Sequence, residues 1–298
     1  MSSTCLVTGA AGFIGSHIAE ALYYKGHRLI LIDNLVNGKL ENLAPWYRAD
    51  QCQFIKADVS EYSAIRQHFL GVDYVFHNAA SKCTVCTDNP VKDLLVNALG
   101  TLNVCEASHE TGVKKVIHAS TGSVNEINSY YGNSKNAGEN YVKTFKNYHH
   151  DFNYSILRYH HVYGPRQDDS DKGGVVPIFI RRISQELPVI IYGDGEQERH
   201  FTHVSDVVRA NMQCMEDINT DLGCYNLIPN NKATVNQLSY ILHELMGRPV
   251  KEEHREPKKG DIRTFNVVDR FPLDFKVTLR DGLLDTIAWY QEHYRSAA

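Results

Sequence analysis

The chain opens with a glycine-rich turn placed between a short apolar run and an amphipathic stretch. The run Cys5–Thr8 predicts a buried strand, and a helical apolar pattern starts near Ile14. Gly9 permits a tight turn, Gly12 lets the backbone approach a pyrophosphate, and Gly15 allows the helix to pack closely on the strand. The helix N-terminus offers N–H groups and a partial positive charge to phosphates. A strand before the glycines and a helix after them predict a dinucleotide-binding βαβ unit.

The following residues continue the alternation of strand and helix. Short runs rich in Val, Ile and Phe and bounded by Gly, Asp or Asn predict strands at Cys5–Thr8, Arg28–Ile32, Gln53–Ile55, Tyr74–Phe76 and Val116–His118. Amphipathic stretches separate them, and a helix at about Tyr131–Tyr148 and a strand at about Tyr154–Tyr159 extend the pattern. This alternation predicts an α/β fold with a doubly wound, Rossmann-like parallel sheet.

The regular alternation of strand and helix patterns ends after Gly164-Pro165, where clusters of turn-forming residues interrupt shorter elements. We therefore expect a dinucleotide-binding domain over residues 1–165. Residues 166–298 are expected to form mainly a smaller mixed α/β C-terminal lobe for the substrate, with some elements returning to the sheet.

Composition narrows the class of protein further. The 298 residues are 43% hydrophobic and 22% charged, with a net charge of −4, which excludes a disordered chain, a collagen-like repeat and a coiled coil. There is no basic field to gather nucleic acid or anionic lipid. The seven cysteines are odd in number and scattered, which favours a reducing compartment. No secretory leader and no membrane-length apolar run occur, so we expect a cytoplasmic protein.

Asp33 stands at the end of the second predicted strand, 18 residues after Gly15. A carboxylate there would accept hydrogen bonds from a ribose 2′-hydroxyl, and no Arg follows closely to receive a 2′-phosphate, which predicts NAD rather than NADP. The alternative is that Asp33-Asn34 simply forms a turn. Asp58-Val59, after the third strand, either holds the adenine or places Asp58 as a helix N-cap ahead of Ser60.

A catalytic group is predicted where the fifth strand ends at Thr121 and a helix begins near Tyr131. Tyr131 and Lys135 are four residues apart and so share one face of that helix. A phenol with its ordinary pKa of about 10 is a poor base, and a nearby ammonium lowers that pKa. With the Thr121 hydroxyl on the same substrate oxygen, this trio would remove a proton from an alcohol while a nicotinamide takes the hydride. The alternative is an ordinary surface helix with a solvated Lys.

Several motifs resemble those of one family, the extended short-chain dehydrogenase/reductases, and specifically its NAD-dependent sugar-nucleotide epimerase/dehydratase group. They cover essentially the whole chain: Thr8–His17, Asp33–Leu35, His77–Ala80, Tyr131–Lys135, Arg158-Tyr159, Val162–Arg166, Tyr192–Gly195, Arg199–Val204 and Gly260–Arg263. The resemblance implies a tightly held NAD, a nucleoside-diphosphate sugar substrate and a homodimer formed through two long helices.

The residues after Thr121 distinguish reactions within this family. Its 4,6-dehydratases carry an Asp-Glu pair there and its decarboxylases keep the Glu, whereas this chain has Gly122 and Ser123. Lys82 also resembles a nicotinamide-side Lys of UDP-galactose 4-epimerases. The resemblance therefore implies inversion at sugar C4, most like a UDP-hexose or UDP-N-acetylhexosamine 4-epimerase, with Tyr131 as base and a transient 4-keto sugar. The alternatives are a dehydratase or 4-ketoreductase, and a non-catalytic dinucleotide-binding regulator.

The resemblance also implies which residues bind ligands. Those expected to contact the cofactor are Gly9, Gly12, Phe13, Ile14, Gly15, Asp33, Asn34, Asn37, Gly38, Asp58, Val59, Ala79, Ala80, Lys82, Asn97, Tyr131, Lys135 and His160. Those expected to contact the substrate are Thr121, Tyr131, His161, Val176, Tyr192, Arg199, Lys258 and Arg263. Surface salt bridges for the cations and core packing for Val176 and Tyr192 are the alternatives.

Some features depart from the family pattern or suggest other chemistry. His161 stands where relatives usually have Asn, and the segment from Thr121 to Tyr131 spans only ten positions, shorter than in relatives. Cys83 and Cys86 have redox or metal spacing, but no second Cys pair or His lies at ligand spacing. No metal site is predicted.

Overall fold

The central feature of the structure, a computed structural model, is a seven-stranded sheet. The structure describes residues 2–81, 86, 88–125, 129–257 and 269–296. Within these residues the strand order is β11-β6-β5-β4-β1-β2-β3. The strands are β1 (Thr4–Thr8), β2 (Arg28–Asp33), β3 (Cys52–Lys56), β4 (Tyr74–His77), β5 (Lys115–Thr121), β6 (Tyr154–Tyr159) and β11 (Cys224–Leu227).

The strands from β3 to β6 pair in parallel, as the alternating sequence pattern predicts. Each predicted strand is present, and most are longer than predicted by one or two residues. The chain leaves β1 toward β2 on one side and later returns to place β4 on the other side. Such a reversal beside the carboxyl end of β1 is the place where doubly wound sheets bind their ligands.

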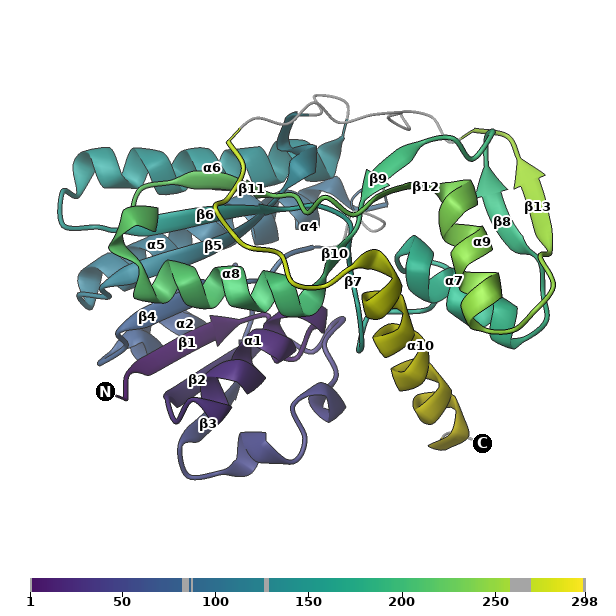
Figure 1. Ribbon diagram of the computed structural model, residues 1–298. Helices are drawn as coiled ribbons and strands as arrows, with labels where there is room; N and C mark the ends of the chain where they lie inside the picture. The colour runs from purple at the N-terminus through teal and green to yellow at the C-terminus, as the bar shows by residue number, and fades with distance from the viewer. Residues whose placement is uncertain (1, 82–85, 87, 126–128, 258–268, 297–298) are drawn as a thin grey trace. The chain divides into compact units, whose positions relative to one another are not determined.

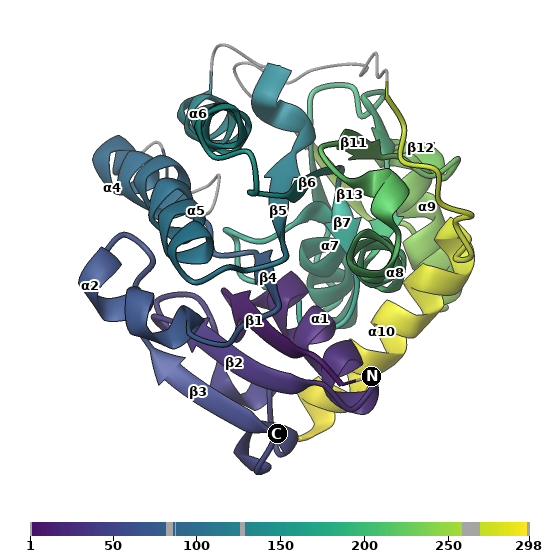
Figure 2. The same ribbon diagram turned by 90° about the vertical axis from the view of Figure 1, so that its left-hand side faces the viewer.

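Helices cover both faces of this sheet (Figures 1 and 2). One face carries α1 (Phe13–Tyr24) and α8 (Val204–Glu216), and the other carries α4 (Pro90–Leu94), a π-helical turn η4 (Leu95–Leu99), α5 (Gly100–Glu110) and α6 (Tyr130–Tyr148). Apolar side chains between the second group of helices and the strands form a buried core that includes Leu6, Val75, Val104, Val116, Val142 and Ile156. The sheet is therefore buried on both faces, which explains its nearly continuous apolar strands.

The predicted helix near Tyr131 is α6, which begins one residue earlier. The Ser129 side chain accepts a hydrogen bond from the N–H of Gly132 at 3.1 Å and caps it. This cap fixes the first turn of the helix, in which Tyr131 lies.

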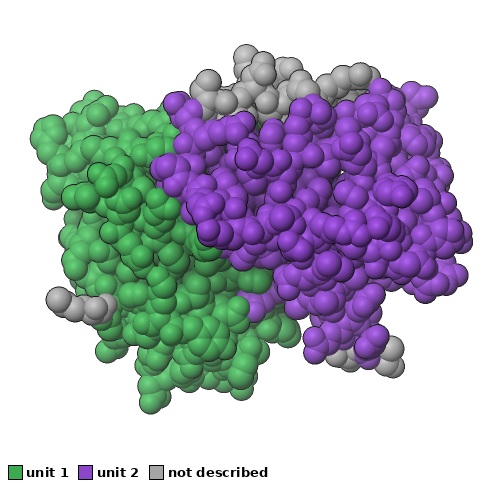
Figure 3. Space-filling model, in the orientation of Figure 1, with its two compact units in different colours: residues 1–159, 208–225 green, residues 160–207, 226–298 purple. Residues whose placement is uncertain are grey.

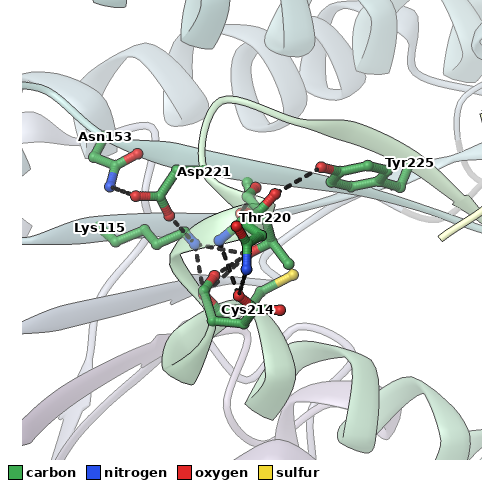
Figure 4. Close-up of polar contacts among 9 residues, drawn as sticks. Lys115, Asn153, Cys214, Thr220, Asp221 and Tyr225 are labelled. Carbon is green, nitrogen blue, oxygen red and sulfur yellow. Dashed lines mark hydrogen bonds and ion pairs between the residues drawn. The ribbon is translucent and has the colours of Figure 1, made fainter. Parts of the chain in front are cut away.

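A buried lysine ties the first residue of β5 to two neighbouring elements (Figure 4). The Nζ atom of Lys115 donates to the main-chain oxygen of Cys214 at 2.6 Å and to Oγ1 of Thr220 at 2.9 Å, and it pairs with Asp221. Asn153 donates to the same carboxylate at 2.7 Å. This cluster lies at the opposite end of β5 from Thr121.

The chain divides into two compact units, coloured separately in Figure 3. Unit 1 contains residues 1–159 and 208–225, and unit 2 contains residues 160–207 and 226–298. Unit 1 also holds α2 (Tyr62–Ile65), η1 (Leu40–Asn42), η2 (Trp46–Arg48), η3 (Arg66–Phe69), η5 (Gly122–Asn125) and η6 (Ile218–Thr220).

Unit 2 is a mixed lobe with its own apolar core. It holds β7 (Val162–Tyr163), α7 (Val175–Ser184), β8 (Val189–Tyr192), β9 (Glu198–His200), β10 (Thr202–His203), β12 (Lys232–Thr234), α9 (Val235–Leu245), β13 (Glu252–Arg255) and α10 (Leu279–Ser296). Its strands form the two-stranded pairs β10-β7, β12-β9 and β13-β8. Phe179, Ile191, Leu238 and Leu283 lie in its core. Among the helices described in either unit, none has the length and apolar character needed to cross a bilayer.

Candidate functional site

The glycine turn of unit 1 has the geometry of a phosphate cradle. Gly9 has a φ of +67°, and a Cβ there would lie 2.8 Å from the main-chain N of Ala79. A Cβ on Gly15 would lie 2.1 Å from the Gly9 oxygen, so the helix packs directly on the turn. Helix α1 begins at Phe13 after Gly12, and no side chain in the described residues caps it or places an acid in its first turn. This positive helix end therefore fits an anionic group such as a pyrophosphate.

Asp33 supports the same turn from the end of β2. Its Oδ2 accepts the N–H of Ala11 at 3.0 Å, and its Oδ1 accepts the N–H of Leu35 at 2.8 Å. Burial raises the pKa of Asp33, and the two N–H donors oppose that shift. Asp33 thus forms the turn that the alternative proposed. Because each carboxylate oxygen accepts more than one hydrogen bond, capacity remains for a ribose hydroxyl.

Asn34 and Asp58 lie together beside this turn. The Asn34 amide donates to Asp58 Oδ2 at 2.7 Å, and Asp58 Oδ1 accepts from the N–H and the hydroxyl of Ser60. Although burial raises the pKa of Asp58, these donors outweigh it and the pKa is lowered. The alternative in which Asp58 is a helix N-cap is wrong, because α2 begins at Tyr62 and its N-cap is Glu61. Asp58 instead closes a tight turn with a residue two positions on.

The other residues of this region that were predicted to bind the cofactor differ in whether their side chains are exposed or buried. Asn37 is exposed in the loop after β2, and a Cβ on Gly38 would lie 2.7 Å from Asp33 Oδ1. The Val59 side chain instead lies in the core, and its main-chain oxygen accepts from Asn103. A contact of Val59 with the cofactor would therefore have to come from its main-chain N–H.

The loop after β4 is held against the glycine turn by Thr8. Its Oγ1 accepts the N–H of Ala79 at 3.1 Å and lies 2.7 Å from Nδ1 of His77. Burial lowers the pKa of His77 to about 3, so this ring is neutral. Ala80 follows in the same loop, and Lys82 lies outside the described residues.

The three predicted catalytic residues all belong to unit 1. Thr121 is the last residue of β5, and its Oγ1 accepts the N–H of Ser123 at 3.2 Å, which leaves the hydroxyl hydrogen available. Tyr131 is partly exposed in the first turn of α6. Lys135, one turn later, is only 2% exposed and donates from Nζ to the Ala119 oxygen at 2.6 Å. This bond joins α6 to the end of β5, two residues before Thr121.

Burial makes the Lys135 amine unusually acidic. Desolvation lowers its pKa from 10.5 to about 8, while the carboxylates of Glu139 and Asp93 act in the opposite direction. Most of the amine is therefore still an ammonium near neutral pH. The structure thus keeps a positive charge one helical turn from Tyr131, where the sequence predicts the ammonium that would assist a phenol base.

Asn97 links three elements through its side-chain amide. Its oxygen accepts the N–H of Ser81 at 2.9 Å, and its nitrogen donates to Asp93 at 2.8 Å and to Oγ of Ser134 at 3.0 Å. Ser134 in turn donates to the main-chain oxygen of Tyr131 at 3.0 Å. Both amide hydrogens are used, so the predicted contact of Asn97 with a cofactor depends on one remaining lone pair of its oxygen.

Sequence reasoning missed Asp93 as a member of this network. Asp93 is buried and lies one turn before Asn97, and its Oδ1 also accepts from the Cys86 thiol. The four-residue spacing of Asp93 and Asn97 was the available signal. Of the two cysteines with redox or metal spacing, Cys86 serves this network as a donor, and Cys83 lies outside the described residues.

The predicted ligand contacts of unit 2 begin at the end of β6. His160 is buried, and its Nε2 lies 3.0 Å from Oδ1 of Asn226. His161 has a φ of +37° and an exposed side chain. Asn and His are among the residues that tolerate positive φ best, which explains how His stands where relatives have Asn.

The remaining predicted substrate residues are dispersed in unit 2. Val176 is in the core on α7, as the packing alternative proposed, and Tyr192 is partly exposed at the end of β8. Arg199 is largely buried on β9, so it is not an ordinary surface cation. Lys258 and Arg263 lie outside the described residues.

Comparison with known proteins agrees with this geometry. Residues 5–227 match the model of the NAD dependent epimerase/dehydratase family. A UDP-glucose 4-epimerase of Mycolicibacterium smegmatis is 31% identical over 96% of this chain and 98% of its own. A UDP-N-acetyl-alpha-D-glucosaminuronate decarboxylase of Bacillus cytotoxicus is 30% identical over 98% of this chain and 99% of its own.

Solved structures give the same result. The crystal structure of a UDP-glucose 4-epimerase with UDP-glucose from Thermotoga maritima superposes with a TM-score of 0.90 at 34% identity, covering 98% of this chain and 99% of the other. The chain belongs to the NAD-dependent epimerase/dehydratase family of extended short-chain dehydrogenase/reductases. It is an enzyme of that family, and its cofactor is NAD.

Proposed function

We propose that this protein inverts the configuration at C4 of a UDP-hexose or UDP-N-acetylhexosamine through a transient 4-keto sugar. The observation that carries the proposal is the arrangement at the end of β5. There, a helix bearing Tyr131 and the buried Lys135 is bonded to the strand that ends in Thr121. The 4-epimerases among the relatives and solved structures support the choice of reaction.

The proton steps in this proposal belong to the chain. Tyr131, as the phenolate favoured by Lys135, takes the proton of the C4 hydroxyl, and Thr121 donates a hydrogen bond to the same oxygen. Bound NAD would supply the acceptor for the C4 hydride and, after the 4-keto sugar has turned over within the site, the donor that returns it to the opposite face of the sugar. Tyr131 then returns the proton to the C4 oxygen, so that neither a proton nor a reducing equivalent is consumed.

The cofactor and the substrate are assigned to named residues. We propose that the glycine turn with Phe13 and Ile14 holds the pyrophosphate of NAD, that Asp33 holds its ribose, and that Asn34, Asn37 and Asp58 lie near the adenosine. In unit 2, Arg199 provides charge for the substrate pyrophosphate, while His161 and Tyr192 contact the nucleotide sugar. We also propose that His160 contacts NAD and that the main chain of Val176 contacts the nucleoside of the substrate.

A second candidate reaction is decarboxylation or dehydration of a sugar nucleotide, which the decarboxylase relative favours. Water elimination at the end of β5 needs an acid and a base after Thr121. Gly122 has no side chain and Ser123 has only a hydroxyl, so neither supplies that pair. This difference in available proton donors is why we place epimerisation first.

We also propose a homodimer formed through the exposed faces of the α4–α5 segment and α6. Val91, Leu95 and Leu99 recur every four residues along that segment and are 65%, 42% and 38% exposed. Tyr130 and Tyr141 are exposed on α6. A second copy of the chain would cover this apolar surface.

The six free thiols among the described cysteines support the expected reducing, cytoplasmic location.

The test is to incubate the purified protein separately with UDP-glucose, UDP-galactose and their N-acetyl forms and to separate the products. Interconversion within a pair without added cofactor is expected. A Tyr131→Phe variant should lose about 10²–10⁴-fold in turnover while keeping NAD bound, and Tyr130→Phe, on the neighbouring exposed residue, should not. No conversion of any of the four by the NAD-loaded protein would defeat the proposal, and carbon dioxide release from UDP-glucuronate would favour decarboxylation.

A further inference from the structure

Helix α6 contains a fully buried carboxylate two turns after Tyr131. Glu139 has an exposed fraction of 0%. Its Oε1 accepts from Oγ of Ser120 at 2.6 Å and from Nε of Arg158 at 2.8 Å. Its Oε2 accepts from Nη2 of Arg158 at 2.7 Å and from Nζ of Lys143 at 3.1 Å. A charge with so many donors is held in one position.

These contacts hold the last residues of β5 against α6. Lys135 reaches from one helical turn to the Ala119 oxygen, and Glu139 reaches from the next turn to the Ser120 hydroxyl. Thr121 is the residue that follows. The position of Thr121 relative to Tyr131 therefore depends on the contacts that join the strand to the helix, which pair residues 16 and 19 positions apart.

We infer that Glu139 is a positioning residue, whose buried carboxylate fixes the end of β5 on α6 and so sets Thr121 and Lys135 relative to Tyr131. The inference rests on the proposed function for its effect on turnover. Its effect on Lys135 is independent of any substrate. Nothing in the assigned chemistry requires Glu139 to touch NAD or sugar.

The charge of Glu139 gives the inference a second, measurable consequence. Burial raises the pKa of Glu139, but the donors Arg158 and Ser120 outweigh burial and the pKa is lowered, so the group is an anion. That anion raises the pKa of Lys135, as Asp93 on α4 does. The other titratable groups that act on Lys135 or Glu139 are His77 on β4, His118 on β5, Lys143 on α6 and Cys224 on β11.

A buried ion pair that only stabilises the fold provides the matched comparison. Lys115 and Asp221 form such a pair at the first residue of the same strand (Figure 4). Lys115→Met should lower the melting temperature and leave the titration of Lys135 unchanged, because the cluster is at the far end of β5. Glu139→Gln is isosteric and removes the charge near Lys135.

The experiment is a titration of the NAD-loaded protein carrying lysine labelled with ¹³C at Cε, in which the Lys135 signal is identified by its loss in Lys135→Met. In Glu139→Gln the midpoint of that signal should fall by about one pH unit, because the nearby anion is gone. In Lys115→Met it should not move. A folded Glu139→Gln protein with an unmoved Lys135 midpoint and unchanged turnover would overturn the inference.

Ser120→Ala keeps the inference testable if Glu139→Gln does not fold. It removes only the bond to the strand and keeps the Arg158 pair. Turnover should fall on the order of tenfold through misplacement of Thr121, with NAD content and melting temperature close to those of the parent. Wild-type turnover in Ser120→Ala would contradict the positioning role. If the parent protein converts no UDP-hexose while the Lys135 midpoint still shifts in Glu139→Gln, the proposed function fails and the link from Glu139 to Lys135 stands.

Discussion

Lys135 and Ala119 are joined by a 2.6 Å hydrogen bond from the side-chain amine of α6 to the main-chain oxygen of β5. One of the three ammonium hydrogens is thereby committed, and two remain for other acceptors. A free lysine would sample many rotamers, whereas this one is held at the strand end by a bond and by burial. The bond to Ala119 therefore fixes the position of the Lys135 amine, which the spacing from Tyr131 places only on a helix face.

The protonation of Lys135 predicts how turnover depends on pH. Burial lowers its pKa to about 8, so the ammonium is lost as the pH rises through that value. Turnover should therefore fall on the alkaline side with a midpoint near pH 8. The measurement is the pH profile of kcat at saturating substrate, and a flat profile up to about pH 10 would contradict the role of the ammonium.

The same shift predicts a dependence of stability on pH. The folded-state pKa of Lys135 is below its unfolded value of 10.5, so between about 8 and 10.5 the unfolded chain binds more protons. The free energy of unfolding contributed by Lys135 should rise with pH in this window, by about 3 kcal/mol over its whole width. Denaturant unfolding should show that the free energy of unfolding of the parent rises relative to that of Lys135→Met as the pH increases. Parallel curves would be evidence against the shift.

Gly12 should affect cofactor binding more than the fold. An added Cβ would lie 3.1 Å from the Gly9 oxygen, a tight contact that a small shift relieves, but its methyl would occupy the approach to the helix end. Gly12→Ala should stay folded and lose at least about tenfold in NAD affinity. Gly15→Ala, whose Cβ would lie 2.1 Å from the same oxygen, should fold poorly. Calorimetric NAD titration and thermal unfolding separate these outcomes, and unchanged NAD affinity in Gly12→Ala would refute the cradle.

Asp33→Asn should weaken both the glycine turn and NAD binding. An amide cannot accept two N–H donors on its two sides, so either the Ala11 or the Leu35 contact is lost, at a cost of about 1–3 kcal/mol. The control is Asp73→Asn, since Asp73 accepts the N–H of Thr4 at the other end of the sheet. Asp73→Asn should lower stability without changing NAD affinity. Equal NAD affinity in both variants would remove Asp33 from the cofactor site.

The proposed dimer predicts a change of mass on a single substitution. Leu95→Glu puts a charge in the middle of the exposed stripe formed with Val91 and Leu99 and should give monomers in sedimentation experiments. Leu70→Glu, on an exposed leucine outside the α4–α6 surface, should leave the mass unchanged. A parent protein that sediments as a monomer would argue against the dimer.

Local patterns were sufficient for the main architecture. The six predicted strands and the helix of Tyr131 are present, and Cys5 is fully buried as its apolar run predicts. Period and spacing act over a few residues, so they can be detected along the chain. The N-cap alternative for Asp58 is wrong because a polar residue ahead of a helix can close a turn as readily as cap the helix, and local pattern does not separate the two.

The sequence by itself determined the βαβ opening, the glycine turn and the common helical face of Tyr131 and Lys135, because each depends on residues close together in the chain. Only the tertiary structure decided that Asn97 bonds to Ser134, that Glu139 bonds to Ser120 and Arg158, and that β11 joins the sheet beside β6. Those partners lie on different helices and strands, and the packing of these elements brings them together. A buried polar group must find a partner wherever the fold places one, and no local period encodes which it will be.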